Sequence, residues 1–251
     1  MALRNVKLTI AYDGSRYHGW QVQPGFTTVQ ETIQEAVRGL LGPEVRLFGA
    51  SRTDAGVHAL GQAGLIQIDS PIPTENLARA ITGRLPDDIA IVKAEDVRMG
   101  FDVIGEVTNK LYRYTIFCGR VRPVLHRNHC WHVPSTLDAG AMHTAAQTLV
   151  GQHDFKSFAS AADNRQVSVR TIFRCDVVEK LEDDNRWVHV DVEGDGFLYN
   201  MVRNIVGSLV EVGSGRWGPE RIAQALEARD RRAAGPIAPP NGLCLMWVEY
   251  A

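Results

Sequence analysis

Apolar and polar residues follow two kinds of spacing along the first hundred residues of the chain. Strict alternation, typical of strands, occurs at residues 4–12, 45–49, 62–68 and 89–97. Helical spacing predicts one helix from Thr28 to about residue 41 and a second from Thr74. Thr28 and Glu31 have the spacing of a capping box. The resulting order, β-α-β-β-α-β, is that of a split βαβ unit.

The second half of the chain repeats this order more loosely. The predicted strands are 110–118, 170–181, 186–194 and 243–250, and the predicted helices are 138–151, 197–213 and 218–228. Asp138 is the expected cap of the first of these helices, and residues 182–185 are an expected turn. We therefore predict an α+β fold of two ferredoxin-like halves, residues 1–104 and 105–251, which share an extended, mainly antiparallel sheet with a central cleft.

Composition narrows the class of protein. The chain has 251 residues, of which 45% are hydrophobic and 22% charged, and this excludes disordered and fibrous proteins. No apolar run approaches the length of a membrane span, and the alternating start does not resemble a signal peptide. The four cysteines are far apart in sequence and form no CxxC motif. We therefore expect a cytoplasmic protein with reduced thiols and no membrane contact.

The net charge of −2 provides no overall basic surface for nucleic acid. Arginine is much more frequent than lysine, however: 22 of the 27 basic residues are arginines. Arginine is suited to phosphate contacts and to stacking on bases, although a GC-rich genome also favours its codons. Basic residues gather in "LYRYTIFCGRVRP", in the group Arg165, Arg170 and Arg174, and in "RDRR". A nucleic-acid surface on this chain would therefore be a local patch.

The stretch "FGASRTDAGVHALGQ", residues 48–62, is unusually charged for a link between two strands. A lone Asp54 in such a turn is most simply a cap for nearby backbone amides. Its neighbours favour a second hypothesis, because Arg52 is too large for a tight turn unless it faces a partner. His58 follows closely, and the glycines of the stretch permit close approach of a ligand. Asp54 is therefore a candidate functional carboxylate.

Tyr112 and Arg203 are the next candidates. On a strand, Tyr112 and Tyr114 share one face and Arg113 points the other way, so the two rings either stack on bases or form a half-buried sheet face. Arg203 lies among the apolar residues of a predicted helix. Such an arginine lies at the edge of the apolar stripe with its stem buried, or faces inward toward a carboxylate such as Asp54.

Other motifs are weak or absent. "HRNHCWH" contains His126, His129, Cys130 and His132, but no second pair of ligands completes a zinc site, and we predict no metal. The GxSxG, P-loop and GxGxxG motifs do not occur, so serine hydrolases, P-loop NTPases and Rossmann enzymes have no support.

The run "SRTDAGVHALGQ" closely resembles the catalytic motif of the tRNA pseudouridine synthase A family. Further similar stretches occur in the same order along nearly the whole chain. They are "YDGSRYHGWQVQP", "TVQETIQEAV", "NKLYRYTI", "LVGQHDFKSF", "GFLYNMVRNIVGSLVEVG" and "NGLCLMWVEY". The resemblance implies the pseudouridine synthase fold and isomerisation of uridine in the anticodon stem-loop of tRNA. It also implies a homodimer that needs no cofactor.

By this resemblance Asp54 is the catalytic carboxylate, Tyr112 is the aromatic residue that stacks on the flipped uracil, and Arg52 and Arg203 bind substrate, with Arg203 keeping Asp54 ionised. Two departures from the family pattern stand out: Ser51 replaces the usual glycine, and residues 100–110 differ from the usual sequence. Two other functions are kept as alternatives. One is a tRNA-binding protein without turnover, and the other is a nucleoside or glycoside hydrolase, which would lack a second acid.

Overall fold

The computed structural model describes residues 3–163, 165–182 and 185–251 of the chain. The chain forms two compact units, Met1–Thr108 with Cys244–Ala251, and Asn109–Leu243. Both units combine helices with mainly antiparallel strands, which confirms the predicted α+β class. The division predicted from the sequence places the last strand in the second half, whereas this strand pairs within the first unit.

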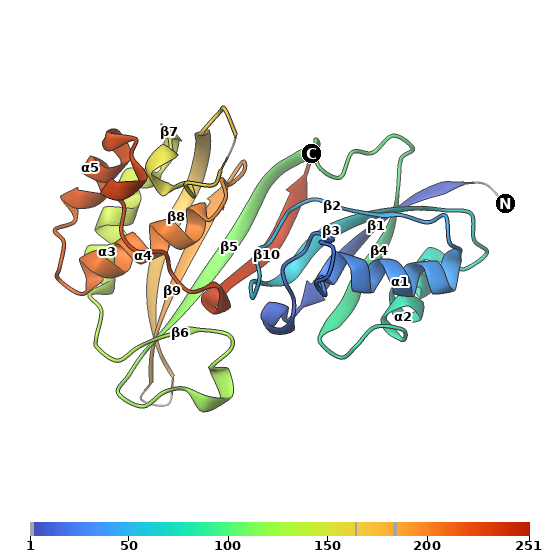
Figure 1. The fold of residues 1–251 in the computed structure, drawn as a ribbon, viewed down its shortest axis with the longest axis horizontal. Helices are drawn as coiled ribbons and strands as arrows, with labels where there is room; N and C mark the ends of the chain where they lie inside the picture. Colours follow the sequence, from blue (N-terminus) through green and yellow to red (C-terminus); the bar gives the residue numbers. More distant parts are fainter. Residues whose placement is uncertain (1–2, 164, 183–184) are drawn as a thin grey trace. The chain divides into compact units, whose positions relative to one another are not determined.

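A mainly antiparallel sheet forms the centre of the first unit (Figure 1). Its strands are β1 (Arg4–Tyr12), β2 (Leu47–Gly49), β3 (His58–Ile68), β4 (Ile89–Val97) and β10 (Leu243–Tyr250). β1 pairs antiparallel with both β3 and β4, β2 pairs antiparallel with β3, and β10 joins the start of β3 in parallel. The sequence predicted these strands, but β3 begins at His58 and is longer than expected. The charged link therefore spans only residues 50–57.

Two helices, α1 (Val29–Leu41) and α2 (Thr74–Thr82), lie on one side of this sheet in Figure 1. Val29, Ile33 and Val37 of α1 are buried at helical spacing, as predicted. The predicted capping box is wrong, because the Thr28 side chain makes no capping bond. The amides of Val29 and Gln30 instead donate to the carbonyls of residues 19 and 20, so a neighbouring segment of main chain caps this helix.

The strands of the second unit are mainly antiparallel and run in the order β5-β9-β8-β7, with β6 beside β5. Its strands are β5 (Val107–Cys118), β6 (Trp131–Val133), β7 (Gly151–Asp154), β8 (Val169–Glu182) and β9 (Asn185–Gly194). Its helices are α3 (Ala139–Ala146), α4 (Met201–Gly213) and α5 (Glu220–Ala228), which contact one another, and α3 also contacts β8 (Figure 1). The central residues of the predicted turn, 183–184, lie outside the described residues.

Several element ends differ from the sequence predictions. Asp138 caps α3 as expected, accepting from the amide of Ala141 at 2.9 Å, but the α-helix ends at residue 146. The helix predicted from residue 197 begins at Met201, because Asn200 has a φ of 61° and interrupts the helical backbone. Short 3₁₀ turns occur at Gly14–Arg16, Val124–His126, Gln147–Leu149, Lys156–Phe158, Arg231–Ala233 and Pro240–Gly242.

Within the described ranges, no helix has both the length and the apolar character needed to cross a membrane.

Candidate active site

The loop that carries Asp54 connects β2 to β3 in the first unit. Asp54 is half-buried on this loop, and Arg52 is exposed. The Asp54 carbonyl accepts from the amide of Val57 at 3.1 Å, which closes a tight turn. Gly56 within the turn has a φ of 77°, a conformation in which glycine avoids strain. The loop therefore presents two of the predicted residues from a sharply defined backbone.

Two buried hydrogen-bonding groups hold Ser51 and Thr53, the residues on either side of Arg52. The Gln62 side chain is 0% exposed; its Oε1 accepts from the Ser51 amide at 3.2 Å and its Nε2 donates to the Ser51 carbonyl at 2.7 Å. The hydroxyls of Thr53 and Tyr12 lie 2.8 Å apart. Burial raises the pKa of Tyr12 far above its ordinary value, so the phenol stays neutral in this bond. Both neighbours of Arg52, and with Thr53 the residue before Asp54, are thus fixed.

A second segment, residues 12–20, lies directly against the loop. Trp20 donates its amide to the Thr53 carbonyl at 3.0 Å. A β-carbon on Gly19, which has a φ of 89°, would lie 2.6 Å from the same carbonyl oxygen. A β-carbon on Gly14 would lie 2.0 Å from the Val57 oxygen. These two glycines allow a contact that any side chain would prevent, which gives the stretch "YDGSRYHGW" a structural reason.

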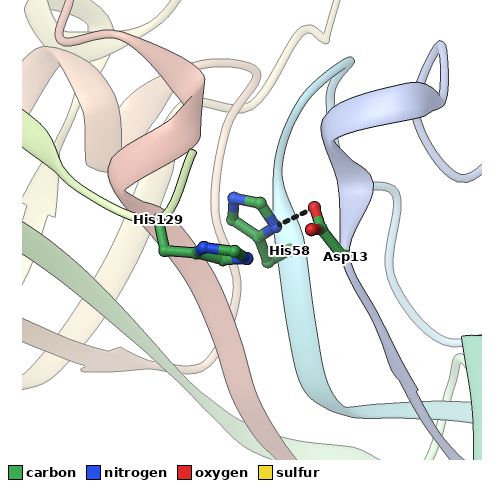
Figure 2. A group of neighbouring side chains, drawn as sticks. All are labelled: Asp13, His58 and His129. Atoms are coloured by element: carbon green, nitrogen blue, oxygen red, sulfur yellow. Dashed lines mark ion pairs between the residues drawn. The ribbon is translucent and has the colours of Figure 1, made fainter. Parts of the chain in front are cut away.

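His58, the first residue of β3, completes this support. Its Nδ1 accepts from the Gly14 amide at 3.1 Å and lies 3.1 Å from Oδ1 of Asp13, the pair marked in Figure 2. A neutral ring accepts from Gly14, whereas a protonated ring donates to Asp13. These contacts tie the first residue of β3 to the segment that lies against the loop. The partners Asp13 and Gly14 were not predicted, although the glycine-rich segment that contains them was noticed.

Tyr112 lies on β5 in the second unit and is 7% exposed. Its ring meets the ring of Phe197 edge-on, with 5.2 Å between the ring centroids. Tyr114 is buried on the same face, and Arg113 points to the other face, where it forms a forked pair with Asp191 at 2.7 and 2.7 Å. The predicted alternation is confirmed. Phe197 was not predicted as a neighbour of Tyr112, because the sequence placed it inside a helix.

Arg203 is half-buried near the start of α4. Its Nε donates to the Ala238 carbonyl at 2.8 Å, and its Nη1 donates to Oδ1 of Asn200 at 3.0 Å. The amide of Ala238 donates back to the Arg203 carbonyl at 3.1 Å. The loop at residues 233–242 therefore holds the arginine from one side and the residue before the helix holds it from the other. Asn200 was missed from the sequence, and its left-handed backbone gave no signal there.

Three side chains of "HRNHCWH" have separate partners within the second unit. The His126 ring meets the Trp187 ring edge-on at 5.4 Å, and the Cys130 thiol donates to the His126 carbonyl at 3.3 Å. Burial raises the pKa of Cys130 to about 11, which disfavours the thiolate. A ring nitrogen of His132 lies 2.7 Å from the Gly119 carbonyl. These contacts explain each of the three residues as part of the local packing.

Comparison with known proteins identifies the family. The model of the tRNA pseudouridine synthase family matches residues 8–104 and 145–251 of the chain. The chain belongs to the tRNA pseudouridine synthase family. Arg52, Asp54 and Arg203 fall within the matched ranges, and Tyr112 falls between them.

Individual members of the tRNA pseudouridine synthase family are similar over the full length. A protein of Acetivibrio thermocellus is 46% identical over 248 residues, which is 99% of this chain and 100% of that protein. Proteins of Pelobacter propionicus and Geobacter sulfurreducens are 44% and 43% identical with the same coverage. All three are named tRNA pseudouridine synthase A. A chain of the archaeal box H/ACA sRNP Nop10-Cbf5 complex aligns with a TM-score of 0.32 and 9% identity over 82% of this chain and 44% of that chain.

Proposed function

We propose that this protein isomerises uridine to pseudouridine in the anticodon stem-loop of tRNA, with Asp54 as the catalytic carboxylate. The observation that carries the proposal is the Asp54 loop itself. A half-buried carboxylate occupies a turn in which Thr53, directly before it, and Ser51, three residues before it, are fixed by buried hydrogen bonds. Such fixed geometry suits a reacting group better than a solvated turn cap. Membership of the family supplies the reaction class.

The reaction breaks the C1′–N1 bond of the uridine, turns the detached ring and joins C1′ to C5. The proton on C5 is lost, N1 gains a proton, and the atoms of substrate and product are the same. The target base must leave its stack, at about a few kcal/mol. Asp54 has three possible roles: attack at C1′, attack at C6, or removal of the C2′ proton. All three require an ionised carboxylate at the position of Asp54.

The other predicted residues have supporting roles in this proposal. Arg52 is exposed and suited to a phosphate or to the gap left by the flipped base. Tyr112 contacts the uracil ring, and the edge-on contact with Phe197 supports the orientation that this requires. Arg203 contributes a positive charge held in place by Ala238 and Asn200, and so supports the reacting groups.

Tritium release tests the reaction. tRNA labelled with tritium at uracil C5 is incubated with the protein, and release to water is followed together with pseudouridine in the digested product. The unchanged chain releases tritium, and Asp54→Asn releases none while it keeps the unfolding midpoint and tRNA affinity. Glu249→Gln, at an exposed carboxylate of the same unit, is the control and stays fully active.

Three results would contradict the proposal. Binding of tRNA without release by the unchanged chain would indicate an RNA-binding protein, and free uracil in the product would indicate a hydrolase. Full activity of Asp54→Asn would show that another group performs the reaction.

We further propose that the protein acts in the cytoplasm as a homodimer. Three buried thiols, Cys118, Cys130 and Cys175, support a reducing compartment, because burial raises the pKa of each and leaves it protonated. Two local groups of arginines on a pair of subunits would together provide the positive surface that a chain of net charge −2 lacks. Light scattering on the purified protein measures the mass; a monomer at micromolar concentration would contradict the dimer.

A further inference from the structure

Two arginines of the second unit contact the segment that follows β9, and a lysine lies on the strand paired with the end of β9. Lys110 on β5 pairs with Gly194, the last residue of β9. A β-carbon on Gly196 would lie 3.6 Å from Nε of Arg170, so the arginine stem packs against this glycine. Arg165 donates from Nη1 to the Phe197 carbonyl at 2.9 Å. One short segment of main chain is therefore in contact with, or paired to, three basic residues from separate parts of the sequence.

The charge of Arg165 acts on both of the others. Burial and the positive charge of Arg165 lower the pKa of Lys110 to about 8. Burial and the same arginine also lower the pKa of Arg170. Such mutual repulsion is unfavourable in the absence of an anion, and a bound anion would relieve it. The cluster thus has the electrostatics of a site prepared for a negative group.

Two carboxylates, Asp163 and Asp195, lie near the cluster and bond to one arginine and to main-chain amides. Asp163 pairs with Arg165 at 2.7 Å and also accepts from the Tyr199 amide at 2.8 Å. Asp195 accepts from the Thr171 amide at 3.0 Å. The hydrogen bonds of Arg170 go to neutral acceptors, since its Nη1 donates to the carbonyls of residues 167 and 169. The two acids thus fix the loop and one arginine.

The cluster lies beside Tyr112 within the same unit. Lys110 and Tyr112 are two residues apart on β5 and so project from the same face of the strand. Phe197, whose carbonyl receives the bond from Arg165, places its ring edge-on against Tyr112. A nucleotide whose base meets Tyr112 would therefore bring its own backbone, or that of a neighbouring nucleotide, close to the three cations.

We propose that Lys110, Arg165 and Arg170 form a binding site for a backbone phosphate of the RNA, next to the nucleotide that Tyr112 contacts. The proposal rests on the proposed function, because the phosphate belongs to the tRNA substrate. Arginine suits a phosphodiester through its forked donors, and lysine adds a compact charge. The site positions substrate and takes no part in bond breaking.

The test measures tRNA affinity as a function of salt for Arg170→Gln and Lys110→Gln. Each loses one phosphate contact, so we expect affinity at low salt to fall about 3- to 10-fold and the slope of log K against log salt to decrease by about one. The loss appears in kcat/KM for tRNA, because these residues contribute to binding. Arg216→Gln is the matched control: Arg216 forks onto Glu211 in the same unit, and its loss leaves affinity and slope unchanged.

Two substitutions at Arg165 distinguish a phosphate contact from a purely structural role. Arg165→Lys keeps the charge but loses the fork onto Asp163, whereas Arg165→Gln loses both. We expect the lysine variant to keep the salt slope and the glutamine variant to lower it. Equal loss in both would overturn the proposal for Arg165, and unchanged slopes in Arg170→Gln and Lys110→Gln would overturn the whole site. If the proposed function fails instead, the unchanged protein releases no tritium from tRNA, a result independent of these slopes.

Discussion

The Asp54 loop and the Arg203 helix hold their functional side chains in different ways. The loop depends on buried side chains from elsewhere in the first unit, among them Gln62 and Tyr12. Helix α4 forms its backbone hydrogen bonds within the helix. Arg203 therefore needs partners only for its guanidinium, and Ala238 and Asn200 supply them. A loop has unpaired donors and acceptors that must be met from outside, and this couples its shape to the fold.

This difference predicts two kinds of mutational effect. Changes in the supports of the loop should lower stability and turnover together, because the same buried hydrogen bonds serve both. Changes at Arg203 should lower turnover with little effect on stability, since the helix remains intact without the guanidinium. The comparison fails if either region shows the behaviour expected of the other.

Arg203→Ala should have the largest effect on turnover. Loss of a fixed positive donor near developing charge lowers kcat by about 10²–10³-fold. The free energy of unfolding should change little, and tRNA affinity should fall far less than turnover. Single-turnover tritium release and filter binding measure the two quantities. If the variant mainly weakens binding, Arg203 serves to hold tRNA and has no role in the reaction.

Gln62→Leu should have the largest effect on stability. It leaves the buried amide and carbonyl of Ser51 without their partner, which destabilises the fold by about 2–4 kcal/mol. Turnover should fall as well, because the loop loses its fastening beside Arg52. Urea unfolding and tritium release follow both effects.

The control for this change lies on the same strand. Gln67 is exposed and donates to Oδ1 of Asn5 at 3.1 Å, so Gln67→Leu should alter stability by about 0.5 kcal/mol or less. Equal losses of stability in Gln62→Leu and Gln67→Leu would show that the two hydrogen bonds between Gln62 and Ser51 contribute no more than an exposed one.

Tyr12→Phe should have a smaller effect of the same kind. It removes the hydroxyl that pairs with Thr53 and lowers stability by about 1 kcal/mol, with a measurable drop in kcat. Tyr17→Phe is the counterpart from the same segment, since the Tyr17 hydroxyl donates to Asp88 at 2.6 Å, away from the loop. We expect Tyr17→Phe to lose stability but keep kcat. A loss of kcat in both variants would mean that stability alone controls turnover.

The sequence predicted much of the fold because burial follows periodicity. The alternation of β1 and the spacing of Val29, Ile33 and Val37 in α1 follow directly from which faces are covered. The errors occur where tertiary contacts replace local signals. The start of α1 is capped by backbone carbonyls from residues 19 and 20, and no local pattern encodes such a cap.

The candidate residues were found, but their supports were not. Asp54 and Arg52 were conspicuous as charges in a short link, and Arg203 as a charge in an apolar helix. Gln62 and Asn200 are ordinary polar residues by sequence, and their roles arise from partners more than ten residues away or from a left-handed backbone. Periodicity reports burial, whereas hydrogen bonds between distant segments depend on the assembled fold.

Ser51 offers the finest test of the comparison, with the smallest expected effect. Its side chain is buried, and among the described residues its hydroxyl has no hydrogen-bond partner. Its amide and carbonyl are both hydrogen-bonded to the Gln62 side chain. Ser51→Ala removes an unpaired polar group and keeps the β-carbon, so we expect stability to rise by up to about 1 kcal/mol. Ser51→Gly, the usual residue of the family, should be less stable than Ser51→Ala by about 0.5–1 kcal/mol, because glycine gains freedom in the unfolded chain.

Urea unfolding ranks the three proteins, and tritium release shows whether the loop still works. If Ser51→Ala is more stable and equally active, the hydrogen bonds of Gln62 to the Ser51 backbone fix the loop and the hydroxyl is not needed. If it loses stability, the hydroxyl has a partner that the fold requires. If it gains stability but loses kcat, the loop needs some freedom beside Asp54, and the coupling of stability to turnover inferred for this region would be reversed.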